Sequence, residues 1–308
     1  MPGRDARRGF REALHDAVSG GRPLILDGAL GTELDNRGAD TRAPLWSGGA
    51  PLREAALVAA IHAEHAEAGA DILTTCTFRT TPRAFAAAGL RDGAWRDAAK
   101  AAVTIAKRAA EPKGAFVVGS IGPLEDCFRP DLAPESREAE REHLALASQL
   151  VEAGVDALVL ETFPCAGEAL AAARAAARCA IPFGASFVTR LDGALLSGDS
   201  LEDAVAAVAD LGASFVGVNC VPPGHVDAGL GLLLPWGRLP IAVYANLGRA
   251  QEGQDWSGSA FLEPESYAAL ALRWAERGAS IVGSCCGSTP AHTAAISRAL
   301  GRNPGTFV

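Results

Sequence analysis

The sequence predicts an α/β protein with a single domain, a (β/α)8 TIM barrel over residues 1–308 whose core runs from about 20 to about 300. Eight short apolar runs recur along the chain, and each is followed by a polar turn and an alanine-rich stretch of helical periodicity. Several of those stretches end in glycine just before the next run, as helices do. Eight strand–helix units make a barrel, and 308 residues suffice to build one.

The apolar runs are continuously hydrophobic rather than alternating, as expected of parallel strands that are buried on both faces. In chain order they are "LILDG" (24–28), "ADILTT" (70–75), "AFVVGS" (115–120), "ALVLET" (157–162), "PFGASFV" (182–188), "FVGVNC" (215–220), "IAVYAN" (241–246) and "SIVGSC" (280–285). An open, doubly wound sheet is the alternative fold. Its glycine fingerprint is absent, because "DGALGTEL" has only Gly28 and Gly31, so the barrel is favoured.

The stretches between the runs predict helices, among them "LREAALVAAIHAEHAEAG", "WRDAAKAAVTIAKRAA" and "LEDAVAAVADLG". Glycines at the left-handed position that stops a helix are Gly69, Gly154, Gly212 and Gly278. No linker rich in proline, glycine or serine divides the chain, which predicts one domain. At the N-terminus, "MPGRDARRGFREAL" mixes acidic residues with its arginines, which favours a surface helix over a transit peptide.

Composition and charge exclude several classes of partner. A formal net charge of −8 argues against a nucleic-acid partner, because neutralising phosphates needs a basic face. The longest uncharged window, 278–297, is interrupted by polar residues, so no membrane span is expected. Seven cysteines in a chain of this length, without a secretory segment, predict free thiols in a reducing cytoplasm rather than a disulfide framework.

Nearly every run ends in a polar or thiol residue, and barrel active sites lie at the carboxyl ends of the strands. The residues at these ends are Asp27, Thr75 with Cys76, Ser120, Glu161, Ser186, Asn219 with Cys220, Asn246, and Cys285 with Cys286. A purely structural barrel has little reason for this pattern, which therefore predicts an active site at that end. Asn219 and Asn246 are expected to orient loops or other site residues rather than to touch a substrate.

Three cysteines at these strand ends form a candidate metal site. Cys220 ends the sixth run, while Cys285 and Cys286 end the eighth, so only one strand separates them in a closed barrel. Three thiolates suit tetrahedral Zn²⁺, and a fourth position left for substrate makes such a site catalytic. Packing, a strained disulfide between the neighbours and a redox pair are the alternatives, although a C-x-x-C pair is absent. The placement at strand ends favours the metal.

Other candidate ligands have simpler interpretations. The remaining cysteines expected to be packing or surface residues are Cys127, Cys165 and Cys179. His62, Glu64 and His65 lie in "IHAEHAEAG", which is not the H-E-x-x-H pattern of a zinc site. A solvated helix face is expected there rather than a second metal.

These motifs together resemble the homocysteine S-methyltransferase family from about residue 20 to about residue 300. The matching pieces are "LDGALGTEL", "LWS", "GADILTTCTFRT", "VVGSIGP", "VDALVLETFP", "VGVNCVPP", "VYANLG" and "VGSCCGSTPAH". Asn-Cys after the sixth run combined with Cys-Cys-Gly-x-Thr-Pro after the eighth is highly specific. The resemblance implies a (β/α)8 barrel in which Cys220, Cys285 and Cys286 hold a zinc ion that binds the homocysteine sulfur.

Three positions depart from the family pattern. Ser284 stands where the family usually has glycine before the paired cysteines. Cys76 replaces an asparagine between two threonines, and Ala245 replaces a proline between tyrosine and asparagine. None of the three is a zinc ligand in this interpretation. Ser284 and Cys76 could narrow the pocket or change its polarity, so they bear on the choice of donor and acceptor.

The resemblance also implies how the amino-acid end of the acceptor is held. Asp27 and Glu161 are expected to bind its ammonium group, with the main-chain amides around Gly28 and Ala29 near its carboxylate. From the residues alone, Asp27 could equally cap a turn and Glu161 could belong to a network inside the barrel. Trp46 is a candidate for a cation–π contact with a sulfonium, worth about 0.5–2 kcal/mol, or it packs on the barrel rim.

The implied reaction is the zinc-dependent transfer of a methyl group from S-methylmethionine or S-adenosylmethionine to the thiolate of homocysteine, giving methionine. A free thiol is mostly protonated at pH 7, and zinc lowers the pKa of a bound thiol, so no catalytic residue beyond the zinc site is expected. No cobalamin- or folate-binding module fits in 308 residues, which implies a small cationic methyl donor. The alternatives are a betaine-type donor, another thiol or selenol acceptor, and a non-catalytic barrel that binds zinc or an amino acid.

Overall fold

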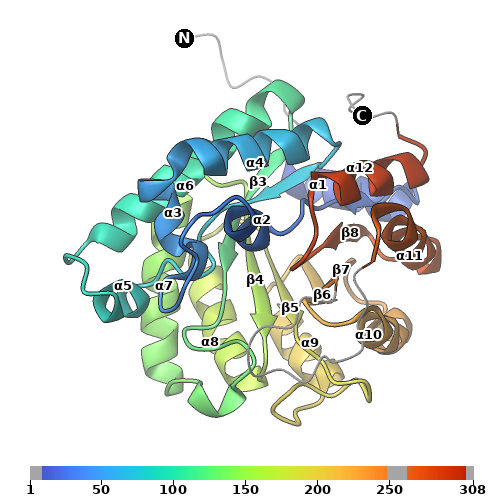
Figure 1. The fold of residues 1–308 in the computed structure, drawn as a ribbon. Helices are drawn as coiled ribbons and strands as arrows, with labels where there is room; N and C mark the ends of the chain where they lie inside the picture. The colour runs from blue at the N-terminus through green and yellow to red at the C-terminus, as the bar shows by residue number, and fades with distance from the viewer. Residues whose placement is uncertain (1–8, 248–261, 303–308) are drawn as a thin grey trace.

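Eight parallel strands form one sheet in the order β1-β8-β7-β6-β5-β4-β3-β2, with helices around it (Figure 1). The structure is a computed structural model and describes residues 9–247 and 262–302. Its strands are β1 (Leu24–Ile25), β2 (Ile72–Thr74), β3 (Phe116–Ile121), β4 (Ala157–Phe163), β5 (Phe183–Phe187), β6 (Phe215–Asn219), β7 (Ile241–Ala245) and β8 (Ile281–Ser284). Each lies within a predicted run or extends it by one residue, so the strand prediction is confirmed.

The sheet closes into a barrel between its first and second strands. Leu26 forms a parallel bridge with Ile72, and the Asp27 N–H donates to the Ile72 carbonyl at 3.0 Å. On its other side β1 pairs in parallel with β8. Closure excludes the open, doubly wound sheet and confirms the barrel. Because all strands run in parallel, all their carboxyl ends lie at the same end of the barrel.

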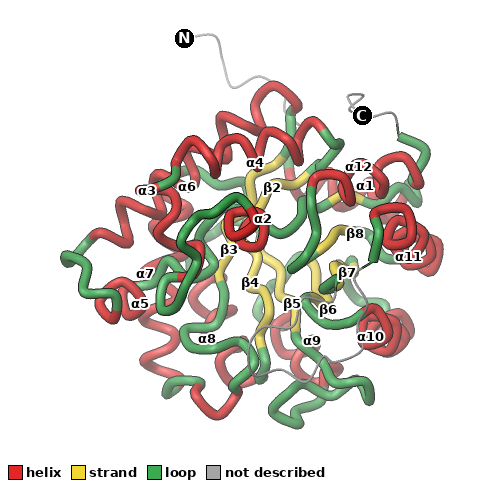
Figure 2. The backbone as a smooth tube through the Cα atoms, in the orientation of Figure 1, coloured by secondary structure: helices red, strands yellow, loops and turns green. Residues whose placement is uncertain are grey.

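The helices surround the strands, which lie at the centre of the molecule (Figure 2). They are α1 (Phe10–Ser19), α2 (Leu30–Asn36), α3 (Ala50–Arg53), α4 (Ala55–Glu67), α5 (Pro82–Ala87), α6 (Ala94–Ala110), α7 (Ser136–Ala153), α8 (Ala166–Ala177), α9 (Leu201–Asp210), α10 (Pro223–Trp236), α11 (Pro264–Arg277) and α12 (Pro290–Ala299), with the 3₁₀ helices η1 (Trp46–Gly49), η2 (Glu111–Lys113) and η3 (Pro130–Leu132). Within residues 9–247 and 262–302, no helix is long and apolar enough to cross a membrane.

The four predicted helix-stop glycines are confirmed. Gly69, Gly154, Gly212 and Gly278 have φ angles of 102°, 94°, 95° and 116°, a left-handed conformation that residues with a Cβ rarely adopt. In each case the next strand begins three residues after the glycine. The glycines therefore fix where a helix ends and the chain turns back into the barrel.

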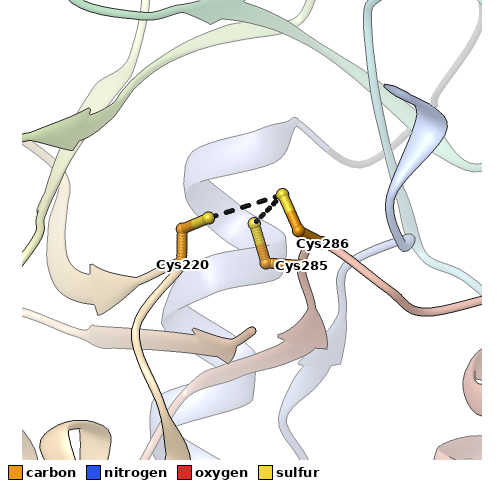
Figure 3. Close-up of side chains that lie close together, drawn as sticks. All are labelled: Cys220, Cys285 and Cys286. Carbon is orange, nitrogen blue, oxygen red and sulfur yellow. Dashed lines mark hydrogen bonds between the residues drawn. The ribbon is translucent and has the colours of Figure 1, made fainter. Parts of the chain in front are cut away.

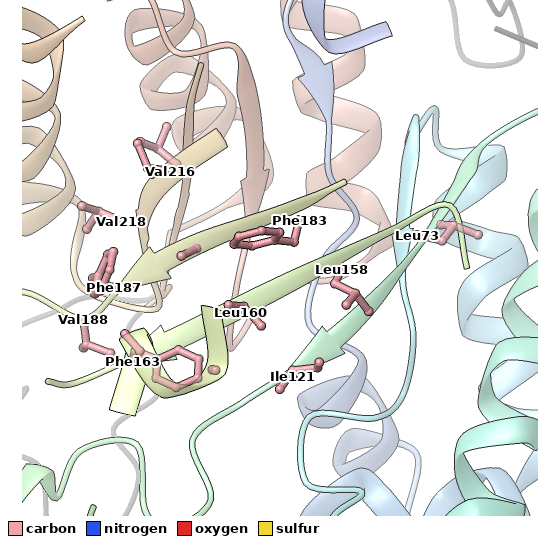
Figure 4. Close-up of a cluster of buried hydrophobic side chains, with 14 of the residues drawn as sticks. Leu73, Ile121, Leu158, Leu160, Phe163, Phe183, Phe187, Val188, Val216 and Val218 are labelled. Carbon is pink, nitrogen blue, oxygen red and sulfur yellow. The ribbon is translucent and has the colours of Figure 1, made fainter. Parts of the chain in front are cut away.

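The two faces of each strand contribute to different apolar layers. Outward-facing side chains such as Leu158 and Phe163 pack against the helices (Figure 4). Inward-facing side chains such as Val159 and Phe215 fill the barrel. The Phe215 ring takes the space beside Gly184, where a Cβ would lie 2.3 Å from it. This burial on both faces explains why the runs are continuously apolar.

Helix α1 covers the amino-terminal end of the barrel. Its buried residues are Phe10, Ala13, Leu14 and Ala17. The Phe10 ring contacts the rings of Phe116 and Phe215, which begin β3 and β6, with centroid separations of 5.4 and 6.1 Å. The predicted N-terminal surface helix thus begins at Phe10, and residues 1–8 of that stretch lie outside the described residues. With this end covered, the carboxyl end is the end at which a ligand can enter.

The expectation of a solvated face for the histidines of α4 is wrong. The side chains of His62 and His65 are 0% and 1% exposed, whereas Glu64 between them is partly exposed and pairs with Arg37. The helix packs against β2 on one side and against α2, α6 and α12 on others, so little of its circumference is free. Burial lowers the pKa of His62 from 6.5 to about 4 and that of His65 to about 3, because a charged imidazole would lose its hydration there.

The free energy of unfolding of a His62→Leu variant should decrease less at acidic pH than that of the native protein. Below the ordinary pKa of His62, the unfolded state binds a proton there while the folded state does not, so the folded state loses stability as the pH falls. This loss begins at about pH 6.5 and is complete by about pH 4. Between pH 7 and pH 5 the native protein should lose about 2 kcal/mol through His62 alone, and the variant should not. Urea unfolding at the two pH values measures the difference. His15→Leu, at an exposed histidine of α1, is the control. An equal loss of unfolding free energy between pH 7 and pH 5 in the native protein and in His62→Leu would contradict the prediction.

Candidate functional site

The carboxyl ends of the strands surround a cavity of about 610 Å³. Its size falls within the range of pockets that hold one or two small metabolites. Every residue expected to bind substrate or metal lines this one cavity, namely Asp27, Gly28, Ala29, Trp46, Glu161, Cys220, Cys285 and Cys286. Residues that are far apart in the chain thus come together where the sequence predicts an active site.

Three sulfur atoms converge in this cavity (Figure 3). The Cys286 Sγ lies 3.6 Å from that of Cys220 and 4.0 Å from that of Cys285, and all three lie within 4.8 Å of one another. A tetrahedral zinc ion with Zn–S bonds of about 2.3 Å requires sulfur atoms about 3.8 Å apart. The three side chains therefore fit a zinc ion. Among the described residues, no other group of His, Cys, Asp or Glu side chains converges in this way.

The backbone aims these thiols at one another. Cys220 has φ 52°, a left-handed conformation that costs about 1–3 kcal/mol for a residue other than glycine. Its N–H donates to the Tyr244 carbonyl at 2.9 Å, and the Cys285 N–H donates to the Ala245 carbonyl at 2.8 Å. The thiols of Cys220 and then Cys285 hydrogen-bond to Cys286 and hold the pKa of that thiol well below its ordinary value. Cys286 is thus the thiol that most readily becomes the thiolate that a metal binds, whereas its neighbours Cys220 and Cys286 raise the pKa of Cys285.

Two carboxylates lie in the same cavity wall. Asp27 accepts hydrogen bonds from the Thr74 N–H and the Thr74 hydroxyl, both at 2.9 Å. The Glu161 Oε1 accepts a bond from the Ser120 hydroxyl at 2.5 Å, and its Oε2 lies 3.1 Å from the Tyr244 hydroxyl. Burial raises the pKa of both carboxyl groups, and the charge of Glu161 raises that of Asp27 further. A cation entering the cavity would relieve this unfavourable burial of negative charge.

The turn after β1 is tightly enclosed. The Ala29 N–H donates to the Ser288 hydroxyl at 3.0 Å, so this amide already has a partner. A Cβ on Gly28 would lie 2.6 Å from the Ser288 Oγ and 2.8 Å from the His65 ring. Glycine is therefore required at position 28 for the turn to pass between these side chains. Of the two amides expected near a carboxylate, only that of Gly28 is without a partner among the described residues.

Trp46 is the first residue of the 3₁₀ helix η1. Its ring stacks on Phe78 at an interplanar angle of 16°, with the centroids 6.1 Å apart. The Arg79 guanidinium lies 4.6 Å from the centre of the same ring. Trp46 thus forms an aromatic wall of the cavity with Phe78, and it already contacts a cation of the protein itself.

Comparison with known proteins identifies the family and the fold. The family model described as "Homocysteine S-methyltransferase" matches residues 24–300. The chain belongs to the homocysteine S-methyltransferase family. It is 31% identical over 289 residues to Homocysteine S-methyltransferase YbgG of Bacillus subtilis, covering 87% of this chain and 91% of that protein.

Two further proteins resemble this methyltransferase over most of its length. The selenocysteine methyltransferase of Astragalus bisulcatus is 29% identical over 312 residues, which are 90% of this chain and 91% of that protein. The metallated form of the homocysteine methyltransferase MmuM from Escherichia coli superposes with a TM-score of 0.79 at 29% identity, covering 93% of this chain and 99% of that one. These likenesses establish the enzyme family and its barrel.

Several residues of the methyltransferase cavity were missed or placed elsewhere by the sequence. Tyr244 lies in the barrel interior beside Glu161. It lies within β7 and not at its end, so the residues at the strand ends did not include it. Cys127 is buried, in keeping with a packing residue, but it also lines the cavity. It follows β3 by several residues, so the residues at the strand ends did not include it. Cys76 also lines the cavity, and its thiol donates to the Ser47 carbonyl at 3.2 Å. Neither belongs to the three-sulfur cluster.

Of the three departures from the family pattern, Ser284 and Cys76 line the cavity and Ala245 does not. Ser284 is 2% exposed, and its hydroxyl has no hydrogen-bond partner among the described residues. It lies 3.2 Å from the place a Cβ on Gly28 would take. The small side chain of Ala245 packs outward in the main core. Its N–H donates to the Tyr267 hydroxyl at 2.9 Å. Proline has no N–H and could not make that bond.

Proposed function

We propose that the enzyme transfers a methyl group from a small sulfonium donor, S-methylmethionine or S-adenosylmethionine, to the thiolate of homocysteine, giving methionine. The observation that carries the proposal is the convergence of three thiols with two carboxylates, the buried Asp27 and the partly buried Glu161, in one cavity. Thiolate ligands and carboxylates are the groups that an acceptor with a thiol at one end and an ammonium at the other requires.

Cys220, Cys285 and Cys286 would hold a zinc ion, since the three sulfurs fit its tetrahedral geometry. When bound, the metal lowers the pKa of an acceptor thiol and so makes the nucleophilic thiolate available at neutral pH. The three cysteines line the cavity, so an acceptor sulfur would reach them from the cavity. Cys220 and the Cys285–Cys286 pair come from different strands, so the barrel itself fixes their separation.

Asp27 and Glu161 would bind the ammonium group of the acceptor, and the Gly28 N–H would donate to its carboxylate. Ionic hydrogen bonds of this kind are stronger than neutral ones in a site from which water is excluded. Fixing both ends of the amino acid aligns its sulfur with the methyl group, and such alignment accounts for most of the rate in an in-line displacement.

The negative charge of the carboxylates and thiolates favours a cationic methyl donor. Trp46 and Phe78 would form the wall that the donor contacts. Because the Arg79 guanidinium already lies over Trp46, a sulfonium would contact this wall beside that ring rather than on the same face. The cavity volume of about 610 Å³ accommodates acceptor and donor together.

A selenol acceptor is the second candidate, and the likeness to a selenocysteine methyltransferase favours it. Ser284 and Cys76 differ from the family pattern near the acceptor, where they could alter the choice between homocysteine and a shorter amino acid. The metal cluster and the carboxylates serve a thiol and a selenol alike.

A panel of donors against acceptors tests the proposal. Zinc-loaded protein is incubated with S-methylmethionine, S-adenosylmethionine or glycine betaine, each with homocysteine, cysteine or selenocysteine, and the products are identified by mass spectrometry. We expect methionine from homocysteine and a sulfonium donor, and no transfer from betaine. Transfer to selenocysteine but not to homocysteine would establish the second candidate instead. Absence of transfer from every sulfonium donor would refute the proposed reaction.

A further inference from the structure

A chain of hydrogen bonds crosses four strands below the cavity and ends at Glu161. The Glu161 Oε2 lies 3.1 Å from the Tyr244 hydroxyl, which lies 2.8 Å from the Ser186 hydroxyl. The Ser186 hydroxyl lies 2.7 Å from the Asn219 Oδ1. Asn219 also bonds to Thr162, the residue after Glu161, so the chain returns to β4. All these distances are those of hydrogen bonds, and each bond needs one proton.

The orientation of the Asn219 amide is fixed by the backbone. The Thr162 N–H donates to the Asn219 Oδ1 at 3.0 Å, and a main-chain N–H can only donate. On the other side, the Asn219 Nδ2 donates to the Thr162 hydroxyl oxygen at 2.8 Å. The Oδ1 is therefore an acceptor, and the proton of its bond to Ser186 must come from the Ser186 hydroxyl.

A count of protons along the chain then leaves one bond without a proton. The single proton of Ser186 is used toward Asn219, so the bond between Tyr244 and Ser186 needs the single proton of Tyr244. Tyr244 can donate its proton to the Glu161 Oε2 at 3.1 Å or to Ser186 at 2.8 Å, but not to both, and the contact with Ser186 is the shorter. Donation to Ser186 leaves the contact with Glu161 without a hydroxyl proton. Only a proton on Glu161 itself completes it. The Ser120 hydroxyl satisfies the other oxygen, Oε1, at 2.5 Å.

The neighbouring carboxylate shows no such deficit. Asp27 accepts two bonds from Thr74, both from groups that bring their own proton. The titratable groups that interact with Glu161 are Asp27 after β1, Tyr244 from β7 and Cys286 after β8. None of these described groups carries a positive charge, so no ion pair with them stabilises Glu161 as a second carboxylate. Burial raises the pKa of Glu161 in the same direction.

We propose that Glu161 is a neutral carboxylic acid in the ligand-free protein and that the ammonium group of an amino-acid substrate displaces its proton into solvent. In the exchange the Glu161 O–H bond breaks, the proton leaves to water, and the carboxylate formed pairs with the ammonium, so charge and atoms balance. Tyr244, Ser186 and Asn219 are positioning residues that hold the acid form. The exchange step rests on the proposed amino-acid acceptor, whereas the protonation of the free protein does not.

Infrared spectroscopy of the zinc-loaded, ligand-free protein at neutral pH tests the proton directly. We expect a carbonyl band of a protonated carboxylic acid that shifts in D₂O, disappears in Glu161→Gln and persists in Asp27→Asn. Tyr244→Phe should shift this band because the acid loses its acceptor. Tyr267→Phe, at the other fully buried tyrosine, should leave it unchanged, since Tyr267 bonds to the Gly283 carbonyl and not to Glu161. Absence of the band, or its persistence in Glu161→Gln, would overturn the proposal.

The Glu161→Gln variant gives a second readout that does not depend on a ligand. A glutamine amide supplies the proton toward Tyr244 that the neutral acid supplies, so this variant should melt at or above the temperature of the native protein. A carboxylate held ionised by its neighbours would instead lose favourable bonds on this change. A clearly lower melting temperature for Glu161→Gln, with no such loss in Tyr267→Phe, would contradict the neutral acid.

Binding of norleucine tests the exchange, because this amino acid has an ammonium and a carboxylate but no thiol to release a proton of its own. Titration calorimetry in buffers of different ionisation enthalpy should detect release of up to one proton per bound norleucine. The affinity should fall up to about tenfold for each unit of pH decrease while Glu161 remains protonated. Binding without proton release would overturn the exchange. Failure of norleucine to bind would count against the proposed acceptor and the exchange alike, while the infrared band would still decide the protonation of Glu161.

Discussion

Replacing Cys286 by serine should remove bound zinc and methyl transfer together. Cys286 is the sulfur that lies within 4.0 Å of both others, so its loss leaves two thiols that cannot complete the tetrahedral set. A serine hydroxyl is not an anionic ligand at neutral pH, and the free energy of metal binding falls accordingly. We expect purified native protein to hold about one zinc per chain and Cys286→Ser to hold almost none.

Methyl transfer should fall with the metal by at least about 1000-fold, which corresponds to about 4 kcal/mol of transition-state stabilisation. Metal analysis and steady-state kinetics on the same preparations measure both effects. Cys179→Ser is the matched control, because that thiol bonds to the Ala175 carbonyl outside the cavity and should keep both metal and activity. Stoichiometric zinc in Cys286→Ser would contradict the ligand assignment.

Asp27→Asn should lower kcat/KM for homocysteine by about 30- to 1000-fold while zinc stays bound. The change removes a buried charge that would pair with the substrate ammonium, and breaking such a pair costs about 2–4 kcal/mol. The amide of the new asparagine can accept only one of the two bonds that Asp27 accepts from Thr74, so the change also disturbs the position of the side chain at residue 27. Retained metal separates this effect from that of Cys286→Ser.

Asp156→Asn provides a matched control for Asp27. Asp156 also accepts a main-chain N–H of the neighbouring strand, from Val117 at 2.7 Å, but it does so just before β4 begins, at the opposite end of the barrel. Its replacement should reduce stability and leave kcat/KM unchanged. A value for Asp27→Asn within about threefold of the native enzyme would show that Asp27 does not hold the substrate.

The strands could be predicted because parallel strands in a barrel are buried on both faces. Val159 faces the interior and Leu158 the helices, so both are apolar and the run reads as continuous. The helix stops could be predicted because only glycine adopts their conformation without strain, as at Gly278. These are local properties, and they act wherever the residue lies.

The burial of His62 could not be predicted from its own helix. Its spacing and polar neighbours are typical of a solvated face, but its helix packs against β2, α6 and α12, which come from elsewhere in the chain. The same holds for Cys127, which reaches the cavity through a loop rather than at the end of a strand. Local pattern carries no information about which distant segment packs on a side chain.

The sequence by itself determined the barrel, the end at which the site lies, and the residue types that gather there, because strand ends and glycine stops are local signals. Only the tertiary structure decided how those residues meet. The distances among Cys220, Cys285 and Cys286 depend on the curvature of the closed sheet. The link from Glu161 through Tyr244 to Asn219 depends on the lateral order of β4, β5, β6 and β7. These hydrogen bonds join side chains of different strands, so no single stretch of the chain contains the information that predicts them.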